Sequence, residues 1–248
     1  MNYRIAVVMP AYNESECIEK VINNWTDFLI KHFPNQSKLI VVNDGSKDNT
    51  GQIISELAQK NEYLIAVTQA NGGHGKAVVR AYEEAISLNP EWVFQTDSDD
   101  QFVCEDVLSL WAKKDDSNFI LGFRQQRFDA PFRLFVTRVL KASLYFIYGT
   151  SINDSNIPFR LIKTAYLKKL LAQLPIPTPF APNIFLSVLA TKAGQSTFDL
   201  PITHKNRETG EVSIQKMKLL EVCWQSFKEL YTFRKELSSK VKNLKSIN

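Results

Sequence analysis

Cysteine is scarce in this sequence, and features that direct a chain into or across a membrane are missing. The three cysteines, Cys17, Cys104 and Cys223, lie far apart and match no metal-ligand spacing, so neither a disulfide framework nor a zinc site is expected. We interpret them as buried thiols of a reducing compartment. No apolar run approaches the roughly 18 residues of a membrane-spanning helix, and no signal peptide precedes the first predicted strand. These absences predict a cytoplasmic protein.

Two glycine-rich nucleotide motifs are also missing. The sequence contains no Gly-x-Gly-x-x-Gly, which excludes the usual dinucleotide fingerprint. The segment Gly72–Lys76 looks like a phosphate loop at first. The Walker pattern, however, requires Gly at the position of Ala70 and Ser or Thr at the position of Ala77. We therefore reject the phosphate-loop interpretation.

Charge is nearly balanced over most of the chain and basic at its end. The net charge is +4, and 44% hydrophobic with 23% charged residues is ordinary for a globular protein. From position 214 onward eight Lys and Arg face three Glu, a balance of +5, which leaves about −1 for the rest. No nucleic-acid partner is predicted. The basic tail suits an anionic surface such as a membrane, and an ordinary solvated helix face explains it equally well.

Short apolar runs alternate with helical patterns through the first hundred residues. This alternation predicts an α/β fold with a Rossmann-like, mostly parallel sheet flanked by helices. Asn13 and Glu16 have the spacing of a capping box, which predicts where the first helix begins. An unusually apolar helix is predicted at Pro131–Tyr148. The predicted strands are residues 5–9, 39–42, 64–67, 92–95, 119–124, 157–162 and 197–202.

The chain is predicted to form one domain, residues 1–213, followed by a basic amphipathic helical tail, residues 214–248. Residues 1–103 would form the nucleotide-binding half and residues 104–213 the acceptor half. Packing of the tail on the body or on a sister subunit is favoured, and a membrane-surface helix or a membrane partner stays open. The apolar residues of the tail follow a seven-residue pattern: Leu220, Cys223, Phe227, Leu230, Leu237, Val241 and Leu244.

The acidic segment Asp97-Ser98-Asp99-Asp100-Gln101 directly follows a predicted buried strand. Alternate side chains of an extended segment share a face, so Asp97, Asp99 and Gln101 can converge. Three oxygen donors suit Mg²⁺ or Mn²⁺ with coordination positions left for phosphates. An acidic turn without a metal is the alternative.

Four segments in order resemble glycosyltransferase family 2, the inverting, nucleotide-sugar-dependent group with the GT-A fold. They are Pro10-Ala11-Tyr12-Asn13-Glu14, Asn43-Asp44-Gly45-Ser46, Gly72–Lys76 and the acidic segment at 97–101. The first and last of them look closest to the dolichol- and polyprenyl-phosphate sugar synthases. The resemblance covers about residues 5–213.

The resemblance implies a role for individual residues on the donor side. Pro10, Tyr12, Glu14, Asp44 and Lys76 would bind the nucleotide sugar. Asp97, Asp99 and Gln101 would hold the metal and diphosphate, with Asp97 also near the ribose. Asn43 departs from the family's pattern, which has Asp at this position.

On the acceptor side, the resemblance implies that Arg124 and Arg133 face an acceptor phosphate and that Arg207 is a mobile clamp on phosphate. Asp154 matches an acid that serves as general base where the acceptor is a hydroxyl. Two departures stand here. Pro158 replaces a Gly, and one extra residue precedes Ser213.

The function predicted from the resemblance is metal-dependent transfer of a sugar to polyprenyl or dolichyl phosphate, peripheral to the cytoplasmic face of a membrane. Three alternatives remain open: a soluble transferase acting on a saccharide or protein hydroxyl, a non-catalytic nucleotide-sugar-binding subunit, and, more remotely, a nucleotidyltransferase. Release of a nucleoside diphosphate rather than pyrophosphate separates the transferases from the last.

Overall fold

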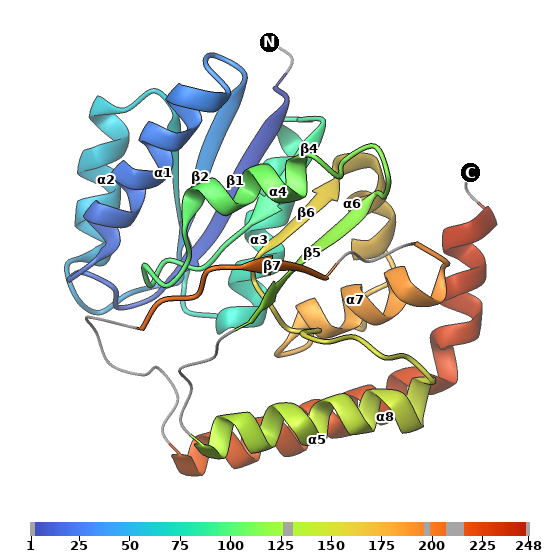
Figure 1. The fold of residues 1–248 in the computed structure, drawn as a ribbon. Coiled ribbons are helices and arrows are strands. Elements are labelled where there is room, and N and C mark those ends of the chain that lie inside the picture. The colour runs from blue at the N-terminus through green and yellow to red at the C-terminus, as the bar shows by residue number, and fades with distance from the viewer. Residues whose placement is uncertain (1–2, 126–130, 196–198, 207–215, 247–248) are drawn as a thin grey trace.

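A seven-stranded mixed sheet forms the centre of the fold (Figure 1). The computed structural model describes residues 3–125, 131–195, 199–206 and 216–246. The strand order is β3-β2-β1-β4-β6-β5-β7, and β6 alone runs antiparallel to its neighbours. The strands are β1 (Ile5–Ala11), β2 (Ser37–Asn43), β3 (Leu64–Thr68), β4 (Trp92–Gln95), β5 (Phe119–Arg124), β6 (Arg160–Lys163) and β7 (Asp199–Ile202). The predicted mostly parallel sheet is thus confirmed.

Helices cover both faces of this sheet. The chain passes from β1 to β3 with α1 and α2 on one face, then returns across the sheet to β4 through α3 on the other, as right-handed crossovers require. The first face carries α1 (Ile18–His32), α2 (Thr50–Lys60), a 3₁₀ turn (Cys104–Asp106) and α4 (Val107–Trp111). The second carries α3 (His74–Ser87), α6 (Thr164–Leu171) and α7 (Pro182–Lys192).

The central strands read as continuous apolar runs because helices cover both of their faces. All seven residues of β1 are buried. Aromatic rings link the layers: Phe94 on β4 lies 5.5 Å from Trp25 of α1 and 4.7 Å from Phe159, measured between ring centroids. Each such fully buried ring contributes about 1.5–3 kcal/mol to folding, so the middle of the sheet is a rigid support for the loops at its edges.

Two further helices lie beyond the carboxyl edge of the parallel strands. Helix α5 (Pro131–Tyr148) follows β5, and the first part of α8 (Lys216–Ser246) runs along it (Figure 1). The second part of α8 rises past α7, where the rings of Phe233 and Phe185 are 5.0 Å apart. No helix among the described residues has the length and apolarity needed to span a membrane.

The C-terminal helix packs on the body, as favoured from its sequence. Leu230, Leu237 and Leu244 of the predicted pattern are buried. Phe233 is buried as well, although the pattern omitted it, because spacings of three and four residues place it on the same helix face as Leu230 and Leu237. The side chains of Leu220 and Cys223 lie outside the described residues.

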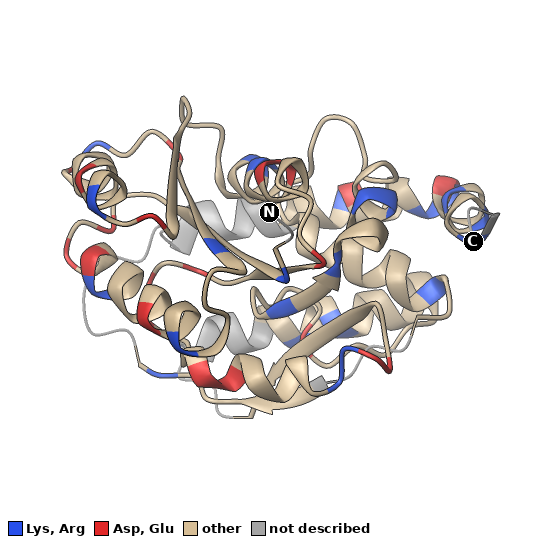
Figure 2. Ribbon diagram, turned by 90° about the horizontal axis from the view of Figure 1, so that it is seen from above, with Lys and Arg blue, Asp and Glu red and all other residues tan. Residues whose placement is uncertain are grey.

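The charged residues are spread over the outside of the fold. Figure 2 shows acidic and basic residues interspersed on the outer helices, so the net charge of +4 is not gathered into one stripe in this view.

Two of the three cysteines, Cys17 and Cys104, are buried free thiols, as interpreted from the sequence.

Candidate active site

The topology brings the predicted motifs to one edge of the sheet. The parallel strands β1, β2, β3, β4, β5 and β7 all end at this edge, and the antiparallel strand β6 begins there. In sheets of this kind ligands bind outside the carboxyl ends of the strands. The residues that follow those ends, or precede β6, are Tyr12, Glu14, Asp44, Lys76, Asp97, Asp99, Gln101, Asp154 and, at the last position of β5, Arg124. Pro10 lies within β1 itself.

Asp44 organises the loop after β3. Its carboxylate is 3% exposed and accepts three hydrogen bonds, from Gln69 Nε2 at 2.7 Å and from the backbone N–H groups of Gly72 and Gly73 at 2.8 and 2.9 Å. These two amides lead into α3, where a phosphate loop would bind its anion. Since the Asp44 carboxylate already occupies them, the structure supports the rejection of a phosphate loop.

The backbone at Gly45 also lies very close to the loop after β3. Gly45 has a φ of +64°, and a Cβ at this position would lie 2.7 Å from the backbone nitrogen of Asn71. Only glycine fits such a position without displacing the loop. The side chain of Lys76, in the first turn of α3, is exposed at the same edge and so is open to an anionic ligand.

The loops after β1 and β2 are cross-linked by hydrogen bonds. Asn13 has a φ of +54°, and its side-chain oxygen accepts a bond from Lys47 N at 2.8 Å. The backbone N–H of Glu14 donates to Thr50 Oγ1 at 2.8 Å. The predicted capping box at Asn13 is therefore wrong: α1 begins at Ile18, after the N-cap residue Cys17, because Asn13 is engaged by the neighbouring loop.

The side chain of Glu14 points inward rather than into solvent. It is 7% exposed, and the Cys17 thiol lies 3.5 Å from its Oε2 and 3.4 Å from the carbonyl of Ser98. Glu14 and Cys17 thereby connect the loop after β1 to the acidic segment after β4. In the structure the predicted nucleotide-binding loop and the predicted metal-binding segment are neighbours.

The C-terminal end of the acidic segment is fixed by an ion pair and by hydrogen bonds. Asp100 has a φ of +57°, and its carboxylate forms an ion pair with Lys20 Nζ at 2.6 Å, so it already has a cationic partner. Gln101 exchanges two hydrogen bonds with Lys205: its N–H side-chain group donates to the Lys205 carbonyl at 3.1 Å, and Lys205 N donates to the Gln101 carbonyl at 2.8 Å. A β-bridge between Phe102 and His204 continues this pairing. The chain that leads to Arg207 is thus anchored to the acidic segment.

The oxygen atoms of the acidic segment are compatible with a divalent cation that is also coordinated by a bound ligand. Among the described residues no three His, Cys, Asp or Glu side chains gather into a metal cluster. Asp97 and Asp99 would supply carboxylates to such a cation, and the Gln101 amide, which donates through its nitrogen, would contribute its oxygen. So few protein ligands suit Mg²⁺ or Mn²⁺, which commonly fill the remaining positions with phosphate oxygens and water.

Asp154 and Arg124 form a buried ion pair with each other. Arg124 Nε and Nη2 donate to the two carboxylate oxygens of Asp154 at 2.7 and 3.0 Å. Their side chains are only 13% and 4% exposed, respectively. This bidentate geometry is the strong form of an arginine–carboxylate contact, so the two residues constrain one another.

Arg160 is a buried cation that the sequence analysis did not single out. It is fully buried and donates to the carbonyls of Ile157, Ser155 and Asn183, which ties the segment before β6 to the start of α7. Burial lowers the pKa of Arg160, while the charges of Asp154 and Asp97 act against that shift. In the sequence, only its position after the apolar pair Pro158-Phe159 could have indicated that Arg160 is buried. The fold is needed to show that burial.

The roles predicted for all the site residues stay predictions, and two of these residues have no described side-chain position. The side chain of Arg133, in the first turn of α5, and the whole of Arg207 lie outside the residues that the structure describes.

The order and geometry of these segments agree with one protein family. The sequence model of glycosyl transferase family 2 matches residues 6–173, more than half of the chain. This chain belongs to glycosyl transferase family 2. The matched region runs from β1 through α6 and contains every described residue of the candidate site.

Among curated relatives, an undecaprenyl-phosphate 4-deoxy-4-formamido-L-arabinose transferase of Edwardsiella ictaluri is 25% identical over 223 residues. The alignment covers 89% of this chain and spans 66% of the relative's length. An uncharacterized protein of Methanocaldococcus jannaschii is 28% identical over 236 residues, which cover 90% of this chain and 98% of that protein.

The fold matches solved structures as well. Glucosyl-3-phosphoglycerate synthase from Mycobacterium tuberculosis, crystallised with Mn²⁺, UDP-glucose and phosphoglyceric acid, superposes with a TM-score of 0.67 at 19% identity. The superposition covers 94% of this chain and 80% of that one. A second crystal structure of the same synthase contains Mg²⁺ and UDP. This member of glycosyl transferase family 2 therefore has the GT-A fold.

Proposed function

We propose that this family 2 glycosyltransferase transfers a sugar, with inversion, from a nucleotide-diphosphate sugar to a polyprenyl phosphate. The observation that carries the proposal is the convergence at one sheet edge of the Asp44-held loop, the Glu14 loop and the Asp97–Gln101 segment. Relatives named for transfer to undecaprenyl phosphate support the acceptor class. The solved structures with UDP-glucose and Mn²⁺ support the donor class.

In this proposal the donor lies across the ends of β1, β2 and β4. Pro10, Tyr12 and Glu14 line the base and ribose pocket. Asp44 acts mainly by holding the Gly72–Gly73 loop in place, and Lys76 at the start of α3 approaches the diphosphate.

The metal would be held by Asp97, Asp99 and the side-chain oxygen of Gln101. When bound, Mg²⁺ or Mn²⁺ stabilises the negative charge that grows on the leaving diphosphate. Arg207 would close on the same phosphates with its bidentate guanidinium group. The pairing of residues 101 and 102 with 204 and 205 brings the chain preceding Arg207 to the acidic segment, as a clamp requires.

A phosphate acceptor needs no general base, because it is already an anionic nucleophile. Arg124 and Arg133 would orient it. The Arg124–Asp154 pair supports this assignment over hydroxyl transfer, since a carboxylate engaged through both oxygens by arginine is poorly placed to remove a proton. Transfer to a saccharide or protein hydroxyl, with Asp154 as base, is the second candidate. A non-catalytic subunit is the third.

A transfer assay with radiolabelled donors tests the proposal. Each of a panel of nucleoside-diphosphate sugars is incubated with Mn²⁺ or Mg²⁺ and either a short polyprenyl phosphate or soluble oligosaccharides. We expect label in the organic phase, release of nucleoside diphosphate, and loss of both with EDTA. Label confined to the water-soluble saccharides would refute the lipid acceptor.

Two matched variants test the metal site. Asp99→Asn removes a proposed metal ligand, and we expect transfer to fall by at least about a hundredfold, since a metal contributes several kcal/mol to the transition state. Asp100→Asn removes the same charge one residue away, from a carboxylate that pairs with Lys20, and should leave metal dependence unchanged. Equal activity of the two variants would contradict the assignment of Asp99.

A further inference from the structure

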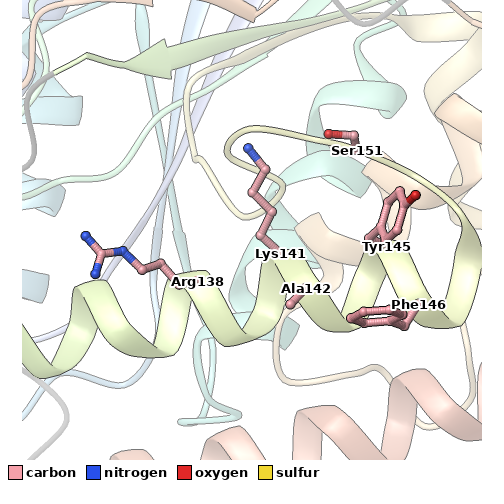
Figure 3. Close-up of a pocket in the computed structure, with 6 residues that line it drawn as sticks. All are labelled: Arg138, Lys141, Ala142, Tyr145, Phe146 and Ser151. Atoms are coloured by element: carbon pink, nitrogen blue, oxygen red, sulfur yellow. The ribbon is translucent and has the colours of Figure 1, made fainter.

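An open pocket of about 350 Å³ lies between α5 and the turn that follows it. Its lining is Arg138, Lys141, Ala142, Tyr145 and Phe146 of α5 and Ser151 of the following segment (Figure 3). Arg138, Lys141 and Tyr145 project from one side of the helix, on the side where Ser151 lies. None of these residues belongs to the site proposed for the donor or the metal.

The two cations of this pocket lack negative partners in the described part of the chain. The Lys141 ammonium group donates to Asn153 Oδ1 at 2.8 Å, a neutral amide. Among the residues described, no carboxylate lies within ion-pair distance of Lys141 or Arg138. Two like charges three residues apart on a helix repel each other, and an anion bound between them would relieve that repulsion.

Large apolar side chains are exposed next to these cations. Phe146 is 81% exposed and Tyr145 is 60% exposed. Helix α8, packed along α5, carries three more exposed aromatic residues at helical spacing, Trp224, Phe227 and Tyr231. Lys228 lies over the Trp224 ring at 5.3 Å. Exposed aromatic rings beside Lys and Arg are typical of surfaces at the level of lipid headgroups.

We infer that the α5 pocket is a docking site for an anionic phospholipid bilayer. Arg138 and Lys141 bind a headgroup phosphate, while Tyr145 and Phe146 enter the interface between headgroups and acyl chains. This docking is separate from recognition of the polyprenyl phosphate acceptor, and it holds whichever acceptor the enzyme uses. It places the carboxyl edge of the sheet, beside which α5 lies, next to the membrane (Figure 1).

Co-sedimentation with vesicles tests the inference without donor or acceptor. The full chain is mixed with vesicles of phosphatidylglycerol and phosphatidylcholine, or of phosphatidylcholine alone, at low ionic strength. We expect binding to the anionic vesicles only. Because each cation near an anionic bilayer strengthens binding about fivefold, Arg138→Gln/Lys141→Gln should weaken it by about thirtyfold. Tyr145→Ser/Phe146→Ser should also weaken it.

Lys31→Gln/Lys60→Gln is the charge-matched control, since both lysines are exposed at the ends of α1 and α2 in the other half of the fold. It should bind like the original chain. All variants change exposed side chains, so unchanged thermal unfolding midpoints are expected. Binding to anionic vesicles that is equal in the Arg138/Lys141 variant and the control would overturn the inference. Transfer to polyprenyl phosphate in detergent would be unaffected by that result, which keeps the two proposals distinguishable.

Discussion

The Arg124–Asp154 ion pair allows the two acceptor classes to be separated by one substitution. In Asp154→Asn the carboxylate becomes a neutral amide of the same shape. If Asp154 only positions Arg124, the variant keeps one acceptor oxygen for the guanidinium, and turnover with polyprenyl phosphate should fall about tenfold or less. If Asp154 is a general base, its removal should cost about 10²–10⁴-fold.

The pH profile distinguishes the roles independently of the size of the loss. A general base produces a fall in kcat/KM at low pH as it becomes protonated, and this fall would disappear in Asp154→Asn. A positioning residue changes the height of the profile and leaves its shape unchanged. Our assignment would be refuted if the fall in kcat/KM at low pH disappeared in Asp154→Asn and the original enzyme acted on a soluble hydroxyl acceptor.

The stability of variants at these two positions tests whether the Arg124–Asp154 ion pair stabilises the fold. Removal of one partner from a buried ion pair destabilises a protein by about 3–5 kcal/mol. With side chains 13% and 4% exposed and contacts of 2.7 and 3.0 Å, Arg124→Met should approach this range. Asp154→Asn should cost less, because a hydrogen bond remains. Arg124→Met/Asp154→Leu should recover much of the loss in urea unfolding. Additive losses in the double variant would show that the two groups do not interact.

Three further expectations concern other parts of the site. Arg207→Ala should lower kcat more than it raises KM for the donor, since a clamp on developing phosphate charge acts in the transition state; an unchanged kcat would contradict this. Asp44→Asn should lower the free energy of unfolding by about 1.5–3 kcal/mol and weaken donor binding in calorimetry, because one of its three hydrogen bonds meets an amide NH₂ group. Burial raises the pKa of the Cys104 thiol to about 12. In a Cys17→Ser/Cys223→Ser background Cys104 should therefore resist iodoacetamide at pH 8 and react after unfolding in urea; rapid alkylation of the folded chain would argue against its burial.

Local patterns in the sequence were sufficient to predict the strands and the order of the motifs. Continuous apolar runs such as Ile5–Ala11 predict buried parallel strands, because both faces of such a strand meet helices. The acidic segment after β4 could be found in the same way, since carboxylates are tolerated where a buried strand ends. The start of α1 was predicted wrongly, because Asn13 bonds to the loop after β2, a partner 34 residues away in sequence.

The sequence alone determined the family, the α/β class and which residues follow each strand, because these depend on short-range periodicity and on motif order. Only the tertiary structure decided how those residues act on one another. Asp44 binds a glycine loop, Asp100 pairs with Lys20, and Asp154 is held by Arg124. These contacts join segments far apart in the chain. The Arg124–Asp154 contact, for example, depends on the antiparallel pairing of β6 with β5, which no local pattern records.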